Sequence, residues 1–153
     1  MVGRGDLAET LRTDIRNLGL EEKAWMTPYC HDMPLAMNAI DCLVHPQIGT
    51  EALGLVICEA HACGKPVIAS AIDGIPEAFA PGNLGSLIPP DSVPALATAL
   101  VASVNQPRPT PDEREQMHRR VVEKFSLRVA AENVLRLYRS LQPSSATHPV
   151  PLR

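Results

Sequence analysis

Short apolar runs alternate with helical patterns along most of this chain. Residues 42–45 and 66–70 are continuous apolar runs, as expected for strands that are covered on both faces. A helical pattern over residues 54–63, which ends at Gly64, separates the two runs, and residues 86–88 are a further expected strand. This alternation predicts parallel βαβ units, and therefore an α/β, Rossmann-like sheet with helices on both faces.

The N-terminal segment follows the same alternation. The expected elements are a strand over residues 1–3, a helix over 6–18, a short strand over 23–27 and a helix over 32–40. Asp6 and Glu9 are spaced as a capping box, and Gly19 is placed to end the first helix in a left-handed conformation. Asp32 is placed to cap the second helix, with Pro34 in its first turn.

Three further helices are expected after the last strand, over residues 92–104, 111–124 and 127–141. Thr110 and Glu113 form a capping box, with Pro111 at the first helical position. A turn is expected at Asp73-Gly74, where Gly74 would supply a positive φ.

Composition narrows the possible classes of protein. The chain has 153 residues, about one domain at roughly 100–200 residues per domain. We assign residues 1–141 to that domain and the Pro- and Ser-rich residues 142–153 to a disordered tail. A net charge of −3 without a basic stripe argues against nucleic-acid binding. The apolar runs are shorter than the roughly 18–20 residues of a membrane span, and no signal peptide is visible.

The 4 cysteines lack the C-x-x-C spacing of a zinc or redox site. We therefore expect reduced thiols, no metal site and a cytoplasmic location. His61 and Cys63 lack partner ligands at metal spacing, and His31 is expected to be a neighbour of the Asp32 cap.

In sheets of this class, ligands bind at the carboxyl ends of the strands. That rule places residues 3–5, 27–31, 45–54 and 70–74 along one rim. His45 ends a strand on this rim, where a structural role and a contact with the ligand are both open.

Gly54 begins a helix on the rim, and a helix start offers unpaired N–H groups and a positive dipole end to a phosphate. Glu59 lies roughly 7–8 Å further along the axis, at ~1.5 Å per residue, which suits a contact with a ribose. Glu51 would then lie on the other side of the phosphates, so the layout fits a nucleoside diphosphate sugar. The alternative is that both carboxylates are ordinary solvated side chains, although Glu59 lies in a helix with almost no other polar residue.

The two carboxylates, with seven residues between them, are followed by a small-residue run and by Gly64-Lys-Pro66-Val. This pattern resembles the C-terminal, donor-binding domain of retaining glycosyltransferases with the GT-B fold, in particular the large family four (group 1). The resemblance covers about residues 1–141, with matching segments at residues 2–5, 32–34, 39–46, 73–77, 85–90 and 123–126. It implies the C-terminal half of a GT-B fold, truncated at its N-terminus.

The resemblance implies a role for each residue around the helix start. Glu59 would bind the ribose hydroxyls of the donor, and Glu51 would be the catalytic residue that contacts the donor sugar near the reacting centre. The other expected donor-binding residues lie on the same rim: Leu53, Gly54 and Leu55, whose backbone N–H groups would hold the diphosphate, and Thr50, Gly3 and Gly5. The family is generally independent of metal, and no cofactor is expected besides the donor substrate.

The implied function is the donor-binding part of a hexosyltransferase-type enzyme, which moves a sugar from a nucleoside diphosphate sugar to a sugar or lipid-linked acceptor. Two parts of the family pattern are absent from the sequence: the N-terminal acceptor domain, and a strand and helix whose Arg and Lys neutralise the diphosphate. Ala52 and Leu53 also replace the usual aromatic residues. We therefore expect the isolated chain to be inactive, with an acceptor domain on another chain as a candidate partner. The alternative is a non-catalytic fragment or subunit that pairs with another chain and binds nucleotide sugar weakly or not at all.

The resemblance also implies a gap in the sheet. The first strand of a doubly wound sheet lies in its middle, and it is the strand that this sequence lacks. The strand at residues 42–45 would then lose a neighbour, which leaves Cys42, Leu43 and Val44 uncovered. The flanking strands could pair directly, another chain could supply a strand, or the chain could aggregate. We expect marginal stability with self-association.

Overall fold

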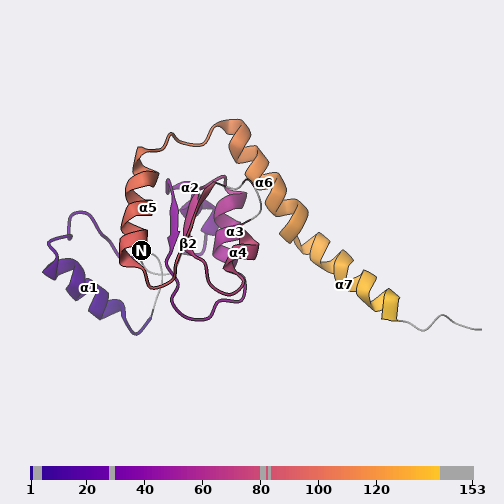
Figure 1. Ribbon diagram of the computed structural model, residues 1–153, viewed down its shortest axis with the longest axis horizontal. Helices are drawn as coiled ribbons and strands as arrows, with labels where there is room; N and C mark the ends of the chain where they lie inside the picture. The colour runs from indigo at the N-terminus through magenta and orange to yellow at the C-terminus, as the bar shows by residue number, and fades with distance from the viewer. Residues whose placement is uncertain (2–4, 28–29, 80–81, 83, 142–153) are drawn as a thin grey trace, which may run out of the picture.

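A computed structural model of the chain describes residues 1, 5–27, 30–79, 82 and 84–141. It contains the predicted alternation of strands and helices (Figure 1). Three parallel strands form one sheet in the order β1 (Leu43–His45), β2 (Val67–Ser70), β3 (Gly85–Ile88). Of the strand expected over residues 1–3, Val2 and Gly3 lie outside the described residues.

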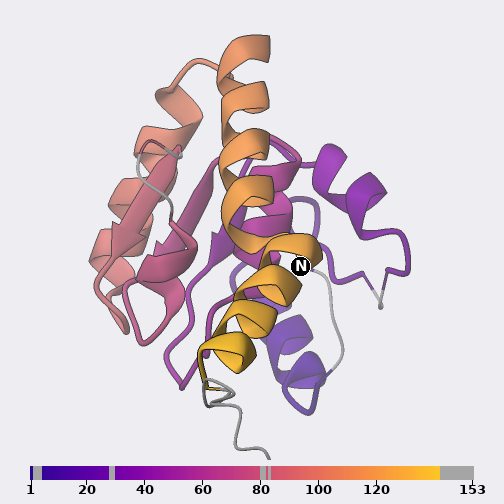
Figure 2. The same cartoon turned by 90° about the vertical axis from the view of Figure 1, so that its right-hand side faces the viewer.

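Helices cover both faces of this sheet (Figures 1 and 2). On one face, α3 (Leu55–Ala62) packs against β1 and β2. Three more helices pack against α3: α2 (Met33–Asn38), α4 (Ile75–Ala78) and α6 (Pro111–Phe125). On the other face, α5 (Val93–Asn105) packs against β2 and β3. The predicted fold class is therefore confirmed.

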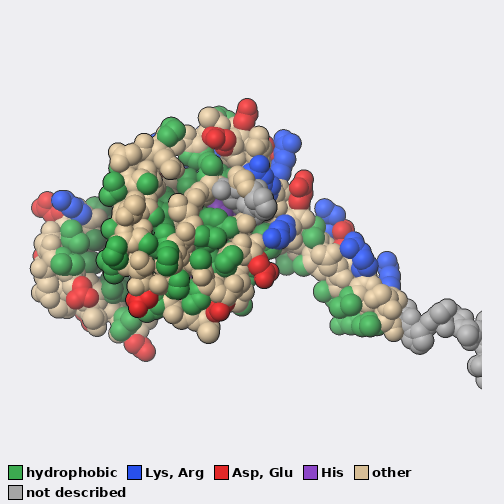
Figure 3. Space-filling model, in the orientation of Figure 1, with side chains coloured by type: hydrophobic (Ala, Val, Ile, Leu, Met, Phe, Trp, Pro, Cys, Tyr) green, Lys and Arg blue, Asp and Glu red, His purple; other side chains and the backbone are tan. Residues whose placement is uncertain are grey.

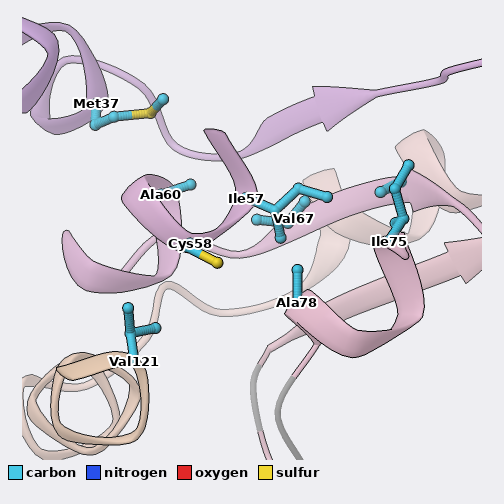
Figure 4. Packing of buried hydrophobic residues seen from close by; sticks show 9 residues of the cluster. Met37, Ile57, Cys58, Ala60, Val67, Ile75, Ala78 and Val121 are labelled. Atoms are coloured by element: carbon cyan, nitrogen blue, oxygen red, sulfur yellow. The ribbon is translucent and has the colours of Figure 1, made fainter. Parts of the chain in front are cut away.

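The core lies between β2 and α3 (Figure 4). All four residues of β2 are buried, which explains its continuous apolar sequence. Val67 and Ala69 join Ile57 and Ile75 in the main hydrophobic cluster. Because successive side chains of a strand point to opposite faces, Ile68 and Ser70 lie on the α5 side.

Four of the local signals for the ends of helices are confirmed. The Asp32 carboxylate accepts a hydrogen bond from the Leu35 N–H at 2.9 Å, and Thr110 begins α6 with both bonds of a capping box. Gly19 and Gly64 both have positive φ, at 63° and 67°. Each signal depends only on residues within one or two turns of the chain.

Two N-terminal predictions are wrong. The first helix, α1 (Ala8–Asn17), has Leu7 and not Asp6 at its N-cap position, because the Ala8 N–H already donates to the Gly5 carbonyl. Residues 23–27 form no continuous strand, since the N–H groups of residues 23 and 24 both turn back to the carbonyl of residue 20. Only Thr27 forms a bridge, and its N–H donates to the Met1 carbonyl at 2.8 Å.

The prediction of a positive φ at Gly74 is also wrong. Gly74 has a φ of −82°, and the left-handed residue of this turn is Asp73, at 44°. A glycine is needed for another reason, because a Cβ at residue 74 would overlap the carbonyl oxygen of Ala52. The turn after β2 therefore lies directly against the loop that precedes α3.

Among the described residues, β1 is an edge strand of the sheet. The Leu43 N–H donates to the Pro66 carbonyl, so strand alternation directs the N–H and C=O of Val44 away from β2. A groove of about 580 Å³ lies along this edge, between Met1 and β1, with side chains of α2 along its wall. Val2 and Gly3, which belong to the expected strand that would close the gap, lie outside the described residues, so the gap stays a prediction.

The last helix, α7 (Leu127–Leu141), follows α6 and extends away from the body of the protein (Figure 1). None of its residues is buried. Figure 3 shows hydrophobic side chains on one side of α7 and basic side chains on the opposite side. No helix within the described ranges is both long and apolar enough to span a membrane. The tail expected over residues 142–153 lies outside the described residues.

Candidate functional site

Gly54 stands immediately before α3 in a left-handed conformation, with φ 75° and ψ 62°. A side chain at this position would be strained, and its Cβ would also lie 2.9 Å from the Cδ1 of Ile57. Gly54 therefore lets the chain turn sharply into α3. The first N–H groups of the helix have no partner within the helix and point towards its N-terminal end.

Glu51 is anchored at three points. Its Oε1 accepts the Gly54 N–H at 3.1 Å. Its own N–H donates to the Oδ2 of Asp73 at 3.1 Å, and its carbonyl accepts the Gly74 N–H at 3.3 Å. The structure thus brings together the predicted rim segments 45–54 and 70–74. Asp73 was expected only as a turn residue, and its anchoring role is a contact that the sequence analysis missed.

His45 ends β1 beside this carboxylate. Its Nε2 lies 3.8 Å from the Oε2 of Glu51, too far for a hydrogen bond. The same Nε2 is buried and has no hydrogen-bond partner in the described part of the protein. The sequence left open a structural role and a contact with the ligand; the structure places this nitrogen beside the predicted catalytic residue.

Glu59 lies on the exposed side of α3. Leu55, one turn earlier on the same side, is 66% exposed, whereas Ile57 and Cys58 face the core. The Glu59 carboxylate makes no hydrogen bond or ion pair with any described residue. An exposed carboxylate without a described partner fits both alternatives from the sequence, a contact with a ribose and an ordinary solvated side chain.

The other predicted donor-binding residues are more scattered. Thr50 is exposed and Leu53 is partly buried against the core, on either side of Glu51. Gly5 is exposed just before α1, and Gly3 lies outside the described residues. The structure therefore groups Glu51 and Gly54 directly, while a common cleft with Glu59 stays a prediction.

His61 is fully buried and structural. Its ring meets the edge of Phe79 with centroids 5.1 Å apart, and its Nε2 lies 3.4 Å from the Leu84 carbonyl oxygen. Burial lowers the pKa of His61 to about 4, so the imidazole is neutral at pH 7. Among the described residues, no cluster of three or more His, Cys, Asp or Glu side chains could hold a metal ion, and the four cysteines are free.

A family model described as "Glycosyl transferases group 1" matches residues 1–123. The chain belongs to this family. The phosphatidyl-myo-inositol mannosyltransferase of Mycobacterium leprae is 31% identical to it, over 95% of this chain and 38% of the relative. An alpha-maltose-1-phosphate synthase of Mycolicibacterium smegmatis is 33% identical, over 72% of this chain and 30% of the relative.

Solved structures support the group 1 assignment. Anabaena Alr3699/HepE, crystallised in complex with UDP, matches this group 1 chain with a TM-score of 0.82 and 27% identity, over 92% of this chain and 40% of that protein. Sucrose-phosphate synthase from Thermosynechococcus elongatus matches with a TM-score of 0.76 and 30% identity, over 90% and 35%. The expected half of a GT-B fold is confirmed. The matches span between about a quarter and two fifths of the length of these and other relatives.

Proposed function

We propose that this group 1 chain is the donor-binding part of a retaining, family-four hexosyltransferase that uses a nucleoside diphosphate sugar. One observation carries the proposal: the Glu51 carboxylate accepts a hydrogen bond from the left-handed Gly54 at the start of α3, and Glu59 is exposed on the same helix, without a partner among the described residues. This arrangement offers a helix N-terminus to a diphosphate and one carboxylate to each side of it.

The proposed roles follow the order of the donor's groups. The N–H groups at Gly54 and Leu55 hold the diphosphate, Glu59 binds the ribose hydroxyls, and Glu51 contacts the sugar. Because the Oε1 of Glu51 accepts the Gly54 N–H, a phosphate oxygen must share or take over that N–H group. The complex of Anabaena Alr3699/HepE with UDP supports this class of ligand.

Calorimetric titration of the 153-residue chain with UDP and with GDP tests donor binding. We expect one of the two to bind, and Glu59→Ala to weaken it by about tenfold, roughly 1.4 kcal/mol. Glu51→Ala should affect binding of the diphosphate less, because its partner is the sugar. Glu123→Ala, an exposed acid on α6, is the matched control. Equal losses for Glu59→Ala and Glu123→Ala would reject the role of Glu59.

The open edge of β1 favours a second candidate function. A groove of about 580 Å³ beside a strand edge that no described residue pairs with suits a chain that works as a subunit and pairs with another chain. In that case a partner supplies the acceptor domain, and the isolated chain binds nucleotide sugar weakly. Transfer from a nucleotide sugar by the purified chain alone would argue against this candidate.

A further inference from the structure

His45 has a buried polar atom that no neighbour satisfies. Most buried polar side-chain atoms in proteins have a hydrogen-bond partner, and an exception calls for an explanation. The Nε2 of His45 is such an exception among the described residues. The charged group beside it is the Oε2 of Glu51, at 3.8 Å.

Backbone pairing and hydrogen bonds hold both His45 and Glu51 in place. His45 is held in β1, paired with Ala69 of β2, and the backbone of Glu51 is tied to Asp73 and Gly74. The Oε1 of Glu51 is already occupied by the Gly54 N–H. A shift of the two side chains by about 1 Å would bring Nε2 and Oε2 to an ordinary N–H···O distance of roughly 2.8 Å.

We propose that His45 is a positioning residue for Glu51: its Nε2–H donates to the Oε2 of Glu51 and fixes the direction of that carboxylate toward the donor sugar. The bond to His45 holds Oε2 in place when a phosphate oxygen shares or takes over the Gly54 N–H that Oε1 accepts. The inference rests on the proposed role of Glu51. The buried Nε2 lies beside Glu51, so the proposed role of His45 acts through that carboxylate.

Nitrogen NMR of the His45 ring in the 153-residue chain tests the contact directly. We expect Nε2 to carry the proton, and Glu51→Gln to shift its resonance, since an amide is a weaker acceptor than a carboxylate. Glu123→Gln, a remote exposed acid, should leave the ring resonances in place. Unchanged His45 resonances in Glu51→Gln would overturn the proposal, whether or not the chain binds any nucleotide.

Binding of UDP-glucose compared with UDP tests the consequence. His45→Phe should weaken the binding of UDP-glucose about fivefold and change the affinity for UDP by less than about twofold, because only the sugar contacts Glu51. His45→Gln, which keeps a side-chain donor, should recover part of the loss, and His118→Gln is the control for histidine replacement. In the Glu51→Gln background, His45→Phe should have no further effect, since coupled residues are not additive.

The outcomes separate the two proposals. The role of His45 would be overturned if His45→Phe weakened the binding of UDP and of UDP-glucose equally. It would also be overturned if the effects of His45→Phe and Glu51→Gln on binding were additive. Either outcome leaves the proposed donor site intact. If the unmodified chain binds neither nucleotide, the proposed donor fails, and the NMR comparison alone decides whether His45 holds Glu51.

Discussion

His61 is surrounded entirely by protein, and its neutral ring fills a space against Phe79. An unfolded chain exposes the same imidazole to water, where its pKa returns to about 6.5. The protonation of His61 therefore makes the free energy of unfolding depend on pH. His45, by contrast, is 24% exposed at its side chain and lies beside a carboxylate.

We predict that stability falls in mildly acidic solution because of His61. Burial lowers its pKa to about 4 in the folded state, so between pH 6.5 and 4 only the unfolded state binds a proton. Its contribution is complete above pH 6.5 and is lost as the pH falls to about 4. At ~1.4 kcal/mol per unit, the loss is about 3 kcal/mol.

Urea unfolding at pH 7 and pH 4.5 measures this loss. His61→Phe, which cannot titrate, should flatten the pH dependence relative to the unmodified chain. The control is His118→Phe, at an exposed histidine, which should keep it. The same pH dependence in all three proteins would contradict the assignment.

Much of the candidate site could be predicted at the level of single residues. Glu51, Gly54 and Glu59 lie within nine residues, so their spacing around a helix start is a local property. The contacts of Glu51 with Asp73 and His45 depend on how β1 and β2 pair, and no local pattern encodes that register. These contacts form only in the folded sheet, where the two loops meet at its end.

At the level of elements, the turn after β2 and the loop before α3 touch through their backbones. We predict that Gly74→Ala destabilises the protein by about 2 kcal/mol, because its Cβ would displace Ala52. Gly49→Ala is the matched control: a Cβ there has only the Nε2 of Gln47 within reach, at 3.8 Å. Thermal unfolding of both variants measures the difference, and equal melting temperatures would show that the loop moves aside without cost.

Predictions from short stretches of sequence were correct for some elements and wrong for others. Caps at Asp32 and Thr110 were correct because a cap is formed by its own first turn. The strand expected over residues 23–27 was wrong because the chain still turns around Leu20. Gly74 was identified correctly as a turn residue but for the wrong reason, since its close contact comes from a loop more than 20 residues earlier.

At the level of the whole molecule, the sheet formed by the described residues has β1 at its edge, beside a large groove. We predict that the chain self-associates through β1, because the N–H and C=O of Val44, which pair with no described residue, offer a strand edge to another copy. Light scattering over a dilution series should show a mass that rises with concentration. A monomer at every concentration would contradict the prediction.

A charge introduced on the edge strand β1 tests whether the association runs through that strand. Val44→Lys should reduce the association, as lysine does on natural edge strands. Val101→Lys places the same charge on an exposed valine of α5, which is 64% exposed, and should have little effect. If Val134→Lys on α7 is the variant that abolishes association, the contact runs through that helix and not through the sheet.

The hydrogen bonds that join Glu51 to Asp73 and Gly74 have a mechanical consequence: Glu51 donates to the first and accepts from the second. They connect the start of α3 to the segment that leaves β2, the central and fully buried strand. The N-terminal end of α3 is thereby tied to the buried centre of the sheet. A ligand that binds there meets a loop whose shape already exists, so little conformational entropy is lost in ordering it.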